Sequence, residues 1–177
     1  MRSLLAALLL ALPGLAHAGP ITAGASLGLT QEEAMSAQSP DHSQSVFGRL
    51  ALTPRLAAQL EVARIDVSDR MQNADVKTVD ALAVLDLGAS GHLVPILLAG
   101  AGLDRASATY GDVAAHHLEA GLGLEYRADG GLVIGADARI GDRTIDSDTT
   151  LVPDLWWNPL LQGGQYRSAR VTLGVRF

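Results

Sequence analysis

Apolar side chains recur at every second residue in many segments of this chain. The clearest segment is the last, where Ala169, Val171, Leu173, Val175 and Phe177 alternate with polar residues and glycine. Side chains of a β-strand point alternately to two faces, so a period of two indicates strands. Turn-forming residues separate the alternating segments. The pattern predicts eight strands, at residues 21–30, 46–52, 56–67, 76–89, 93–105, 113–128, 132–145 and 169–177.

Short turns alternate with longer polar connections between the predicted strands. The short turns are centred on Pro54, Gly91 and Gly130. The longer connections fall at 31–44, 69–75, 107–112 and 146–163. An up-and-down β-barrel with tight turns at one end and loops at the other has this order. The pattern therefore predicts a barrel in which both chain ends lie on the short-turn side.

The predicted strand at 56–67 alternates less regularly than the others. Leu60 and Val62 share a parity with Arg64, whereas Ile65 takes the other parity. A bulge near Ala63 would explain this break, and so would a position of Arg64 at a polar rim.

Charged residues face glycine across the turn at Gly130. If residues 129–131 form a three-residue turn, Tyr126 faces Ile134 and the apolar faces of the two strands coincide. The same register pairs Glu125 with Gly135, Asp137 with Gly123 and Arg139 with Gly121. Pairing a large side chain with glycine suits the cramped interior of a narrow barrel. We therefore expect the charged face to line a polar lumen and the apolar face to contact lipid.

Composition and charge narrow the classes of function. The formal net charge is -6, and no basic stripe is present, which argues against a nucleic-acid-binding protein. The chain has no cysteine, so it can form neither a disulfide nor a thiolate metal site. Aromatic residues make up 4% of the chain, which is few for a barrel with aromatic girdles.

The N-terminal residues have the pattern of a secretory signal peptide. Arg2 provides the positive start, residues 4–12 the apolar run, and Ala16-His17-Ala18 the cleavage site. We expect residues 1–18 to be removed, leaving a single barrel domain at 19–177.

The C-terminal strand resembles the assembly signal of Gram-negative outer-membrane β-barrels, with Val171, Leu173 and Val175 leading to a terminal Phe177. The whole mature chain resembles the small eight-stranded barrels of the OmpA and OmpX/Ail type. The resemblance implies an all-β, eight-stranded antiparallel up-and-down transmembrane β-barrel with a filled polar lumen. It also implies an outer-membrane location, contacts with outer-membrane lipid and lipopolysaccharide, insertion by the barrel-assembly machinery, and a monomer.

The predicted lumen collects most of the charged residues of the strands. Its expected ion-pair network comprises Arg49, Glu61, Asp80, Asp86, Glu119, Glu125, Asp137, Arg139 and Arg170, with Asp104, Arg127 and Arg176 on the same face. Buried charges require partners, and the register makes Glu119 and Arg139 diagonal neighbours. A salt-bridged plug is the expected role, and a gate or proton relay is the alternative.

Aromatic residues outside the lumen are candidates for interface positions. Trp156 and Trp157 could lie in the outer headgroup belt or form a partner-binding tip, and Tyr110 is a further candidate for the outer belt. Phe177 and Tyr126 are expected at the periplasmic girdle.

No catalytic residue, metal site or cofactor is predicted. Of His116 and His117, only one can enter any given site, because adjacent strand residues point to opposite faces. Neither histidine belongs to the His-x-Ser pair of the lipid-A deacylase barrels, which this chain resembles in architecture. The sequence thus predicts a non-enzymatic barrel that serves envelope integrity or surface-loop interactions. Two alternatives remain: an outer-membrane lipid-modifying enzyme of lipid-A deacylase type, and a soluble lipocalin-like periplasmic carrier with the opposite inside-out assignment.

Overall fold

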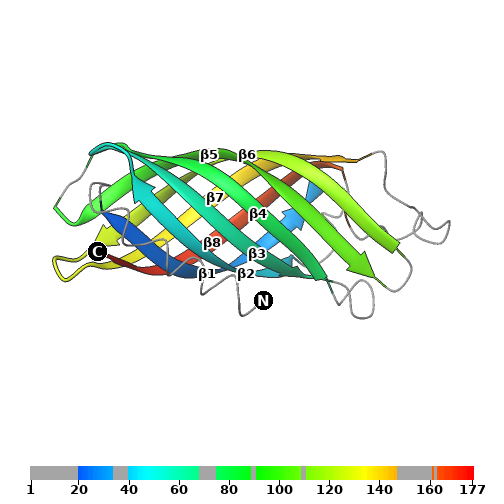
Figure 1. The fold of residues 1–177 in the computed structure, drawn as a ribbon, viewed down its shortest axis with the longest axis horizontal. Coiled ribbons are helices and arrows are strands. Elements are labelled where there is room, and N and C mark those ends of the chain that lie inside the picture. Colours follow the sequence, from blue (N-terminus) through cyan, green and yellow to red (C-terminus); the bar gives the residue numbers. More distant parts are fainter. Residues whose placement is uncertain are drawn as a thin grey trace, which may run out of the picture.

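The computed structural model is an eight-stranded β-barrel, described for residues 20–33, 40–67, 75–88, 91–108, 111–146, 161 and 163–177 (Figure 1). The strands are β1 (Ile21–Glu32), β2 (Asp41–Ala51), β3 (Leu56–Asp66), β4 (Asp75–Asp86), β5 (Leu93–Ala108), β6 (Gly111–Arg127), β7 (Leu132–Ile145) and β8 (Gly164–Arg176). The expected signal peptide at 1–18, Tyr110, Trp156 and Trp157 lie outside the described residues. Among the residues described, no helix is long and apolar enough to cross a membrane.

Each strand pairs antiparallel with the next, and β1 pairs with β8 to close the ring. Thr22 lies opposite Arg176 at this closure, and the Phe177 amide donates a 2.8 Å hydrogen bond to the Ile21 carbonyl. The C-terminus therefore lies at the end of the barrel that carries the short turns (Figure 1). The predicted fold class is confirmed: all-β, closed, up-and-down and antiparallel.

Several strands extend further than the alternation predicted, so two expected loops are shorter than 31–44 and 107–112. β1 continues to Glu32 and β2 begins at Asp41, while β5 continues to Ala108 and β6 begins at Gly111. These strand ends carry polar or small residues on both faces, and alternation cannot mark a strand there. The backbone ladder continues nevertheless, because its hydrogen bonds do not depend on side-chain polarity. β7 begins and ends at the predicted residues.

Of the two explanations offered for the irregular alternation at 56–67, the bulge near Ala63 is wrong. Ala63 pairs with Ser45 on one side and Thr78 on the other, and both ladders run through this position without interruption. Arg64 is exposed on the outer surface near the loop end of β3. A polar residue on the outward face, near the rim, accounts for the irregular alternation.

The barrel wall has an apolar outer face and a polar inner face. Leu118, Leu122 and Ile140 are exposed by 67%, 62% and 65%, whereas Glu119 and Arg139 are buried. The register between β6 and β7 is the predicted one, with Tyr126 opposite Ile134. The side chains that would form the core of a soluble protein thus face outward.

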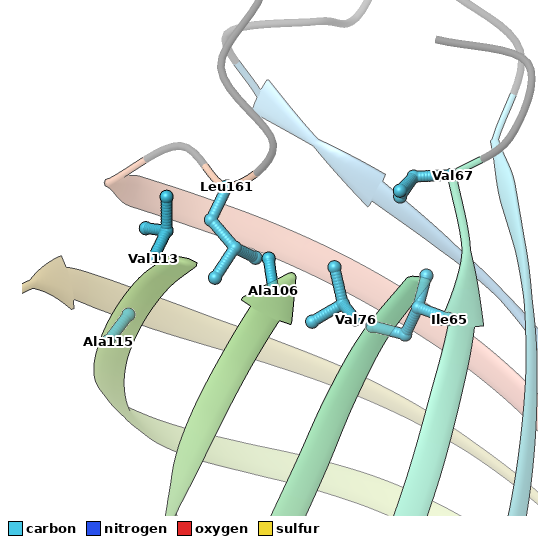
Figure 2. Packing of buried hydrophobic residues seen from close by; sticks show 7 residues of the cluster. All are labelled: Ile65, Val67, Val76, Ala106, Val113, Ala115 and Leu161. Atoms are coloured by element: carbon cyan, nitrogen blue, oxygen red, sulfur yellow. The ribbon is translucent and has the colours of Figure 1, made fainter. Parts of the chain in front are cut away.

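Two apolar clusters inside the barrel lie near its two ends, which the sequence did not predict. Figure 2 shows the cluster at the loop end, formed by Ile65, Val67, Val76, Ala106, Val113, Ala115 and Leu161. The cluster at the short-turn end consists of Val84, Val94, Ile96 and Leu98. The charged residues in the middle of the lumen, such as Asp80 between Val76 and Val84 on β4, lie between these two layers, whereas Asp86 pairs with Ile96 at the level of the second layer.

Candidate functional site: the charged lumen

All nine predicted lumen residues lie on the inner face of the barrel. Six of them are buried: Glu61, Asp80, Glu119, Glu125, Asp137 and Arg139. The other three, Arg49, Asp86 and Arg170, are half-buried. Of the additional residues on this face, Asp104 is buried, Arg127 is half-buried and Arg176 is exposed at the short-turn mouth.

Arg139 is the centre of the middle network. Its guanidinium contacts Asp137 at 2.7 Å, Glu119 at 2.8 Å and Glu61 at 3.2 Å. Arg170 of β8 binds the other oxygen of Glu61. These contacts join β3, β6, β7 and β8 across the lumen. Because every carboxylate has a cationic partner, the cost of burying the charges is largely offset.

Glycines make room for these side chains. Gly121 lies opposite Arg139, and a Cβ on Gly121 would be 2.8 Å from the Arg139 Cγ. Gly123 lies opposite Asp137, and a Cβ there would be 3.0 Å from the Asp137 Cβ. Both distances are shorter than ordinary van der Waals contacts. A Cβ would also lie 2.6 Å from the Ala138 carbonyl oxygen at Gly121 and 2.9 Å from the Ala136 carbonyl oxygen at Gly123, so the neighbouring backbone and the charged side chains together favour glycine at both positions.

A second network occupies the short-turn half of the lumen. Arg127 binds both oxygens of Asp86, at 2.6 and 3.0 Å, and also Glu125 at 2.7 Å. Arg49 binds Glu125 at 2.6 Å and Gln59 at 2.9 Å. Gln59 in turn donates to Glu61 at 3.1 Å, which connects this network to the middle one.

A third network, near the loop end, surrounds His117. The imidazole Nδ1 lies 2.9 Å from Asp104, and Nε2 lies 3.0 Å from Asp80. Arg143 binds Asp104 at 2.8 Å and Glu32 at 2.6 Å. His117 points into the lumen, whereas His116 lies on the outer surface, as the opposite facing of adjacent residues requires.

The sequence analysis missed three buried members of the third network: Glu32, Arg143 and Tyr166. Tyr166 donates a hydrogen bond to Glu119 at 3.2 Å, and its ring lies 4.9 Å below the Arg143 guanidinium. Arg143 shares the parity of Asp137 and Arg139 on β7, so extending the alternation would have identified it. Glu32 and Tyr166 lie beyond the predicted strand ends, where no comparable signal exists.

The middle and loop-end networks leave little empty space between their side chains. A cavity of about 20 Å³ remains near the third network, between residues that include Thr78, His117 and Tyr166. This volume holds about one water molecule. The middle of the lumen can therefore hold fixed charges and small polar species, whereas a hollow of about 620 Å³ lies at the short-turn end among residues that include Arg49, Asp86 and Arg127.

The C-terminal residues of the expected assembly signal lie on the outer surface. Val171, Leu173 and Val175 are exposed by 63%, 58% and 45%, and Phe177 by 79%. Tyr126 is exposed by 43% near the same end, beside His92 at a ring distance of 5.5 Å. These positions place a row of apolar side chains where a partner or lipid can contact them.

No protein-family model matches the sequence, and no curated protein matches it. The structure is similar to Neisserial surface protein A, with a TM-score of 0.66 and 14% identity over 89% of this chain and 96% of that chain. It is similar to the N-terminal β-barrel domain of Pseudomonas aeruginosa OprF, with a TM-score of 0.57 and 14% identity over 88% and 97% of the two chains. It is also similar to the outer membrane enzyme PagL, with a TM-score of 0.50 and 14% identity over 89% and 99%. At such low identity these similarities establish the fold.

Proposed function

We propose that this chain, which has the fold of the eight-stranded outer-membrane β-barrels, is a non-enzymatic barrel of the Gram-negative outer membrane that contributes to envelope integrity or surface-loop interactions. The observation that carries this proposal is the inverted wall, with apolar side chains outside and ion pairs inside. Exposed apolar side chains such as Leu27, Leu118 and Val171 form a larger apolar surface than water-soluble proteins usually expose, and such a surface suits contact with lipid. The outer-membrane neighbours support the same location.

A row of cations on the outer surface supports contact with the outer leaflet. Arg64 lies opposite Lys77, and Lys77 lies opposite Arg105, on three neighbouring strands. Two residues further from the loop end lies an apolar row: Val62, Val79 and Leu103. Like charges placed directly opposite each other repel, and within this row Arg105 also binds Asp112 at 3.1 Å. Lipopolysaccharide phosphates are anions that such a row of cations can bind just above the apolar band.

Cell fractionation tests the location and the closed barrel. The full-length chain should appear in the outer membrane and migrate faster on a semi-native gel before boiling than after it. Deletion of Phe177 should weaken assembly, because it removes the last residue of the proposed signal for the barrel-assembly machinery. A soluble protein with unchanged mobility on boiling would refute the proposal.

Purification tests the contact with lipopolysaccharide. A Lys77→Glu/Arg105→Glu variant should retain the gel shift but lose most of the lipopolysaccharide that copurifies with the unaltered barrel. Arg55→Glu is the matched control, because Arg55 is exposed at the opposite, short-turn end. Equal retention by all three proteins would remove the cationic row from the proposal while leaving the barrel unaffected.

A lipid-modifying enzyme is the second candidate, because the outer surface carries a histidine–carboxylate pair. His116 Nδ1 lies 2.9 Å from Asp146, and both side chains are about half exposed. Thr144, a hydroxyl residue, lies opposite His116 in the ladder. If this group hydrolyses lipid, expression of the barrel should change the mass of lipid A, and His116→Ala should abolish the change. An unchanged lipid A mass would favour the non-enzymatic proposal.

A soluble carrier is not supported by the wall of the barrel. A carrier of apolar ligands requires apolar side chains around a cavity, as in lipocalins. Here Glu61, Asp80, Glu119 and Arg139 occupy the middle of the interior.

A further inference from the structure

Three side chains from two non-adjacent strands meet above the glycines of β5. Asp80 of β4 and His117 of β6 lie on either side of Gly102 in the ladder. Glu119 of β6 lies opposite Gly100. A Cβ on Gly102 would collide with the Asp80 carboxylate and with the His117 ring. The glycine therefore lets a carboxylate and an imidazole on β4 and β6 reach each other across the strand between them.

Asp80 is an exception among the buried carboxylates of this lumen. Its side chain is 1% exposed, and its Oδ2 has no hydrogen-bond partner among the described residues. The nearest polar atom recorded is His117 Nε2, at 3.0 Å from Oδ1. A buried carboxylate oxygen without a hydrogen bond is costly, so Asp80 can accept a further partner in addition to His117.

His117 is held in the orientation of a metal ligand. Asp104 lies 2.9 Å from Nδ1, and Asp104 is itself fixed by Thr78 at 2.6 Å and Arg143 at 2.8 Å. When Nδ1 donates its proton to a carboxylate, the lone pair of Nε2 is directed to the other side, here toward Asp80. Metal-binding histidines generally have such a carboxylate partner, which fixes the tautomer and increases the basicity of the ligand.

The charges around this group favour a cation. In the connected middle and loop-end networks, six described carboxylates meet three guanidiniums. The carboxylates are those of Glu32, Glu61, Asp80, Asp104, Glu119 and Asp137. The guanidiniums are those of Arg139, Arg143 and Arg170. Protonation of His117 adds one positive charge, whereas a divalent ion bound to neutral His117 adds two and also supplies Asp80 with a partner.

We propose that Asp80, His117 and Glu119 bind one divalent transition-metal ion inside the barrel. One potential ligand atom from each of the three side chains lies within 4.8 Å of the others, so small side-chain rotations bring them to coordination distance. One imidazole nitrogen with two carboxylates suits ions of the Zn²⁺ or Mn²⁺ class. Glu119 is oriented by Arg139 at 2.8 Å and by the Tyr166 hydroxyl at 3.2 Å. The ion would link β4 to β6 across β5.

Metal binding is measured on the untagged mature chain, refolded from urea into detergent after treatment with a chelator. With Co²⁺ present during refolding, the folded barrel should retain about one ion per chain and show visible ligand-field absorption. With Zn²⁺ present, the urea midpoint should rise with metal concentration, because an ion that binds only the folded state stabilises it. The site is independent of the proposed envelope function, so fractionation results do not affect this test.

Substitutions on adjacent residues distinguish this site from other histidines. His117→Gln and Asp80→Asn should abolish Co²⁺ absorption and the Zn²⁺-dependent shift of the midpoint. His116→Gln should retain both, because His116 faces the outer surface. The heat-dependent gel shift identifies which variants fold. If a variant does not fold, the Zn²⁺-dependent shift of the urea midpoint of the unaltered chain still tests the proposal. Failure of the folded, unaltered barrel to retain metal, or retention by folded His117→Gln, would overturn the proposal.

Discussion

Replacement of Arg139 by methionine tests whether the ion pairs hold the barrel together. Arg139 is 3% exposed and binds Asp137, Glu119 and Glu61 simultaneously. Methionine retains an unbranched apolar stem but leaves Asp137 without its cationic partner and weakens the charge balance of the other two. Breaking a buried ion pair in this way costs about 3–5 kcal/mol. We expect the free energy of unfolding to fall by that amount.

The effect is measured by urea unfolding of the refolded barrel in detergent, followed by far-UV circular dichroism and by the gel shift. With a slope of about 1–3 kcal/mol per molar urea, the midpoint should fall by at least about 1 M. Arg167→Met is the control, because Arg167 is exposed on the outer face of β8. Its free energy of unfolding should change by less than about 0.5 kcal/mol.

A double variant separates the lost ion pair from lost side-chain volume. Asp137→Asn combined with Arg139→Met should be less destabilising than the sum of the two single changes, because the unpaired carboxylate is removed. The reasoning fails if the free energy of unfolding of Arg139→Met lies within about 1 kcal/mol of that of the unaltered chain, or if the effects of the two single changes simply add in the double variant. Either result would show that the networks fill space without stabilising the barrel.

Three further results are expected from the same unfolding assay. Leu98→Ala should lower the free energy of unfolding by about 2–5 kcal/mol, because it leaves a cavity in the apolar cluster at the short-turn end. Leu97→Ala on the outer face should lower it by less. Equal losses would contradict the assignment of Leu98 to the inner face and Leu97 to the outer face. Leu118→Arg, near the middle of the outer face of β6, should cost about 2–4 kcal/mol in lipid vesicles, and Leu132→Arg near the turn about 0–1 kcal/mol. Gly121→Leu should prevent the Arg139 contacts and reduce the yield of heat-shifted barrel, so normal folding of this variant would show that the glycine is not needed for space.

Alternation and turn chemistry together predicted the barrel wall. β7 occupies the predicted residues, and the facing of Tyr126 with Ile134 follows from the three-residue turn at Gly130. The charged residues opposite glycine followed from the same register. These features were predictable because a strand with one lipid face and one lumen face repeats its contrast at every second residue.

The apolar clusters inside the lumen were not predictable from alternation. Residues 93–98 are apolar at both parities, so the period that assigns faces is absent at the start of β5. The structure places Val94, Ile96 and Leu98 inside and exposes Leu93 and Leu97. Both faces accept apolar side chains here, because the inner face packs against Val84 and the outer face contacts lipid.

The group around Asp80 and His117 could not be predicted for a different reason. These residues belong to β4 and β6, which are separated by β5, and their meeting depends on two successive registers. The connection between β4 and β5 includes Gly88 and Gly91, both with positive φ, at 122° and 62°. Such a turn has several possible lengths and registers, and the sequence does not select among them.

The strand pairings of the closed barrel differ in how far apart in the sequence their two strands lie. Seven pairings join strands that follow each other in sequence, but the pairing of β1 with β8 brings Thr22 to Arg176. Joining such distant residues costs more chain entropy than forming a hairpin, so we expect this seam to form last, after the seven hairpins have brought its edges together. Until then, β1 and β8 are the two open edges of a curved sheet. The same strand β8 carries Phe177 after its last residue, so the segment proposed for recognition during assembly is also the segment that seals the barrel.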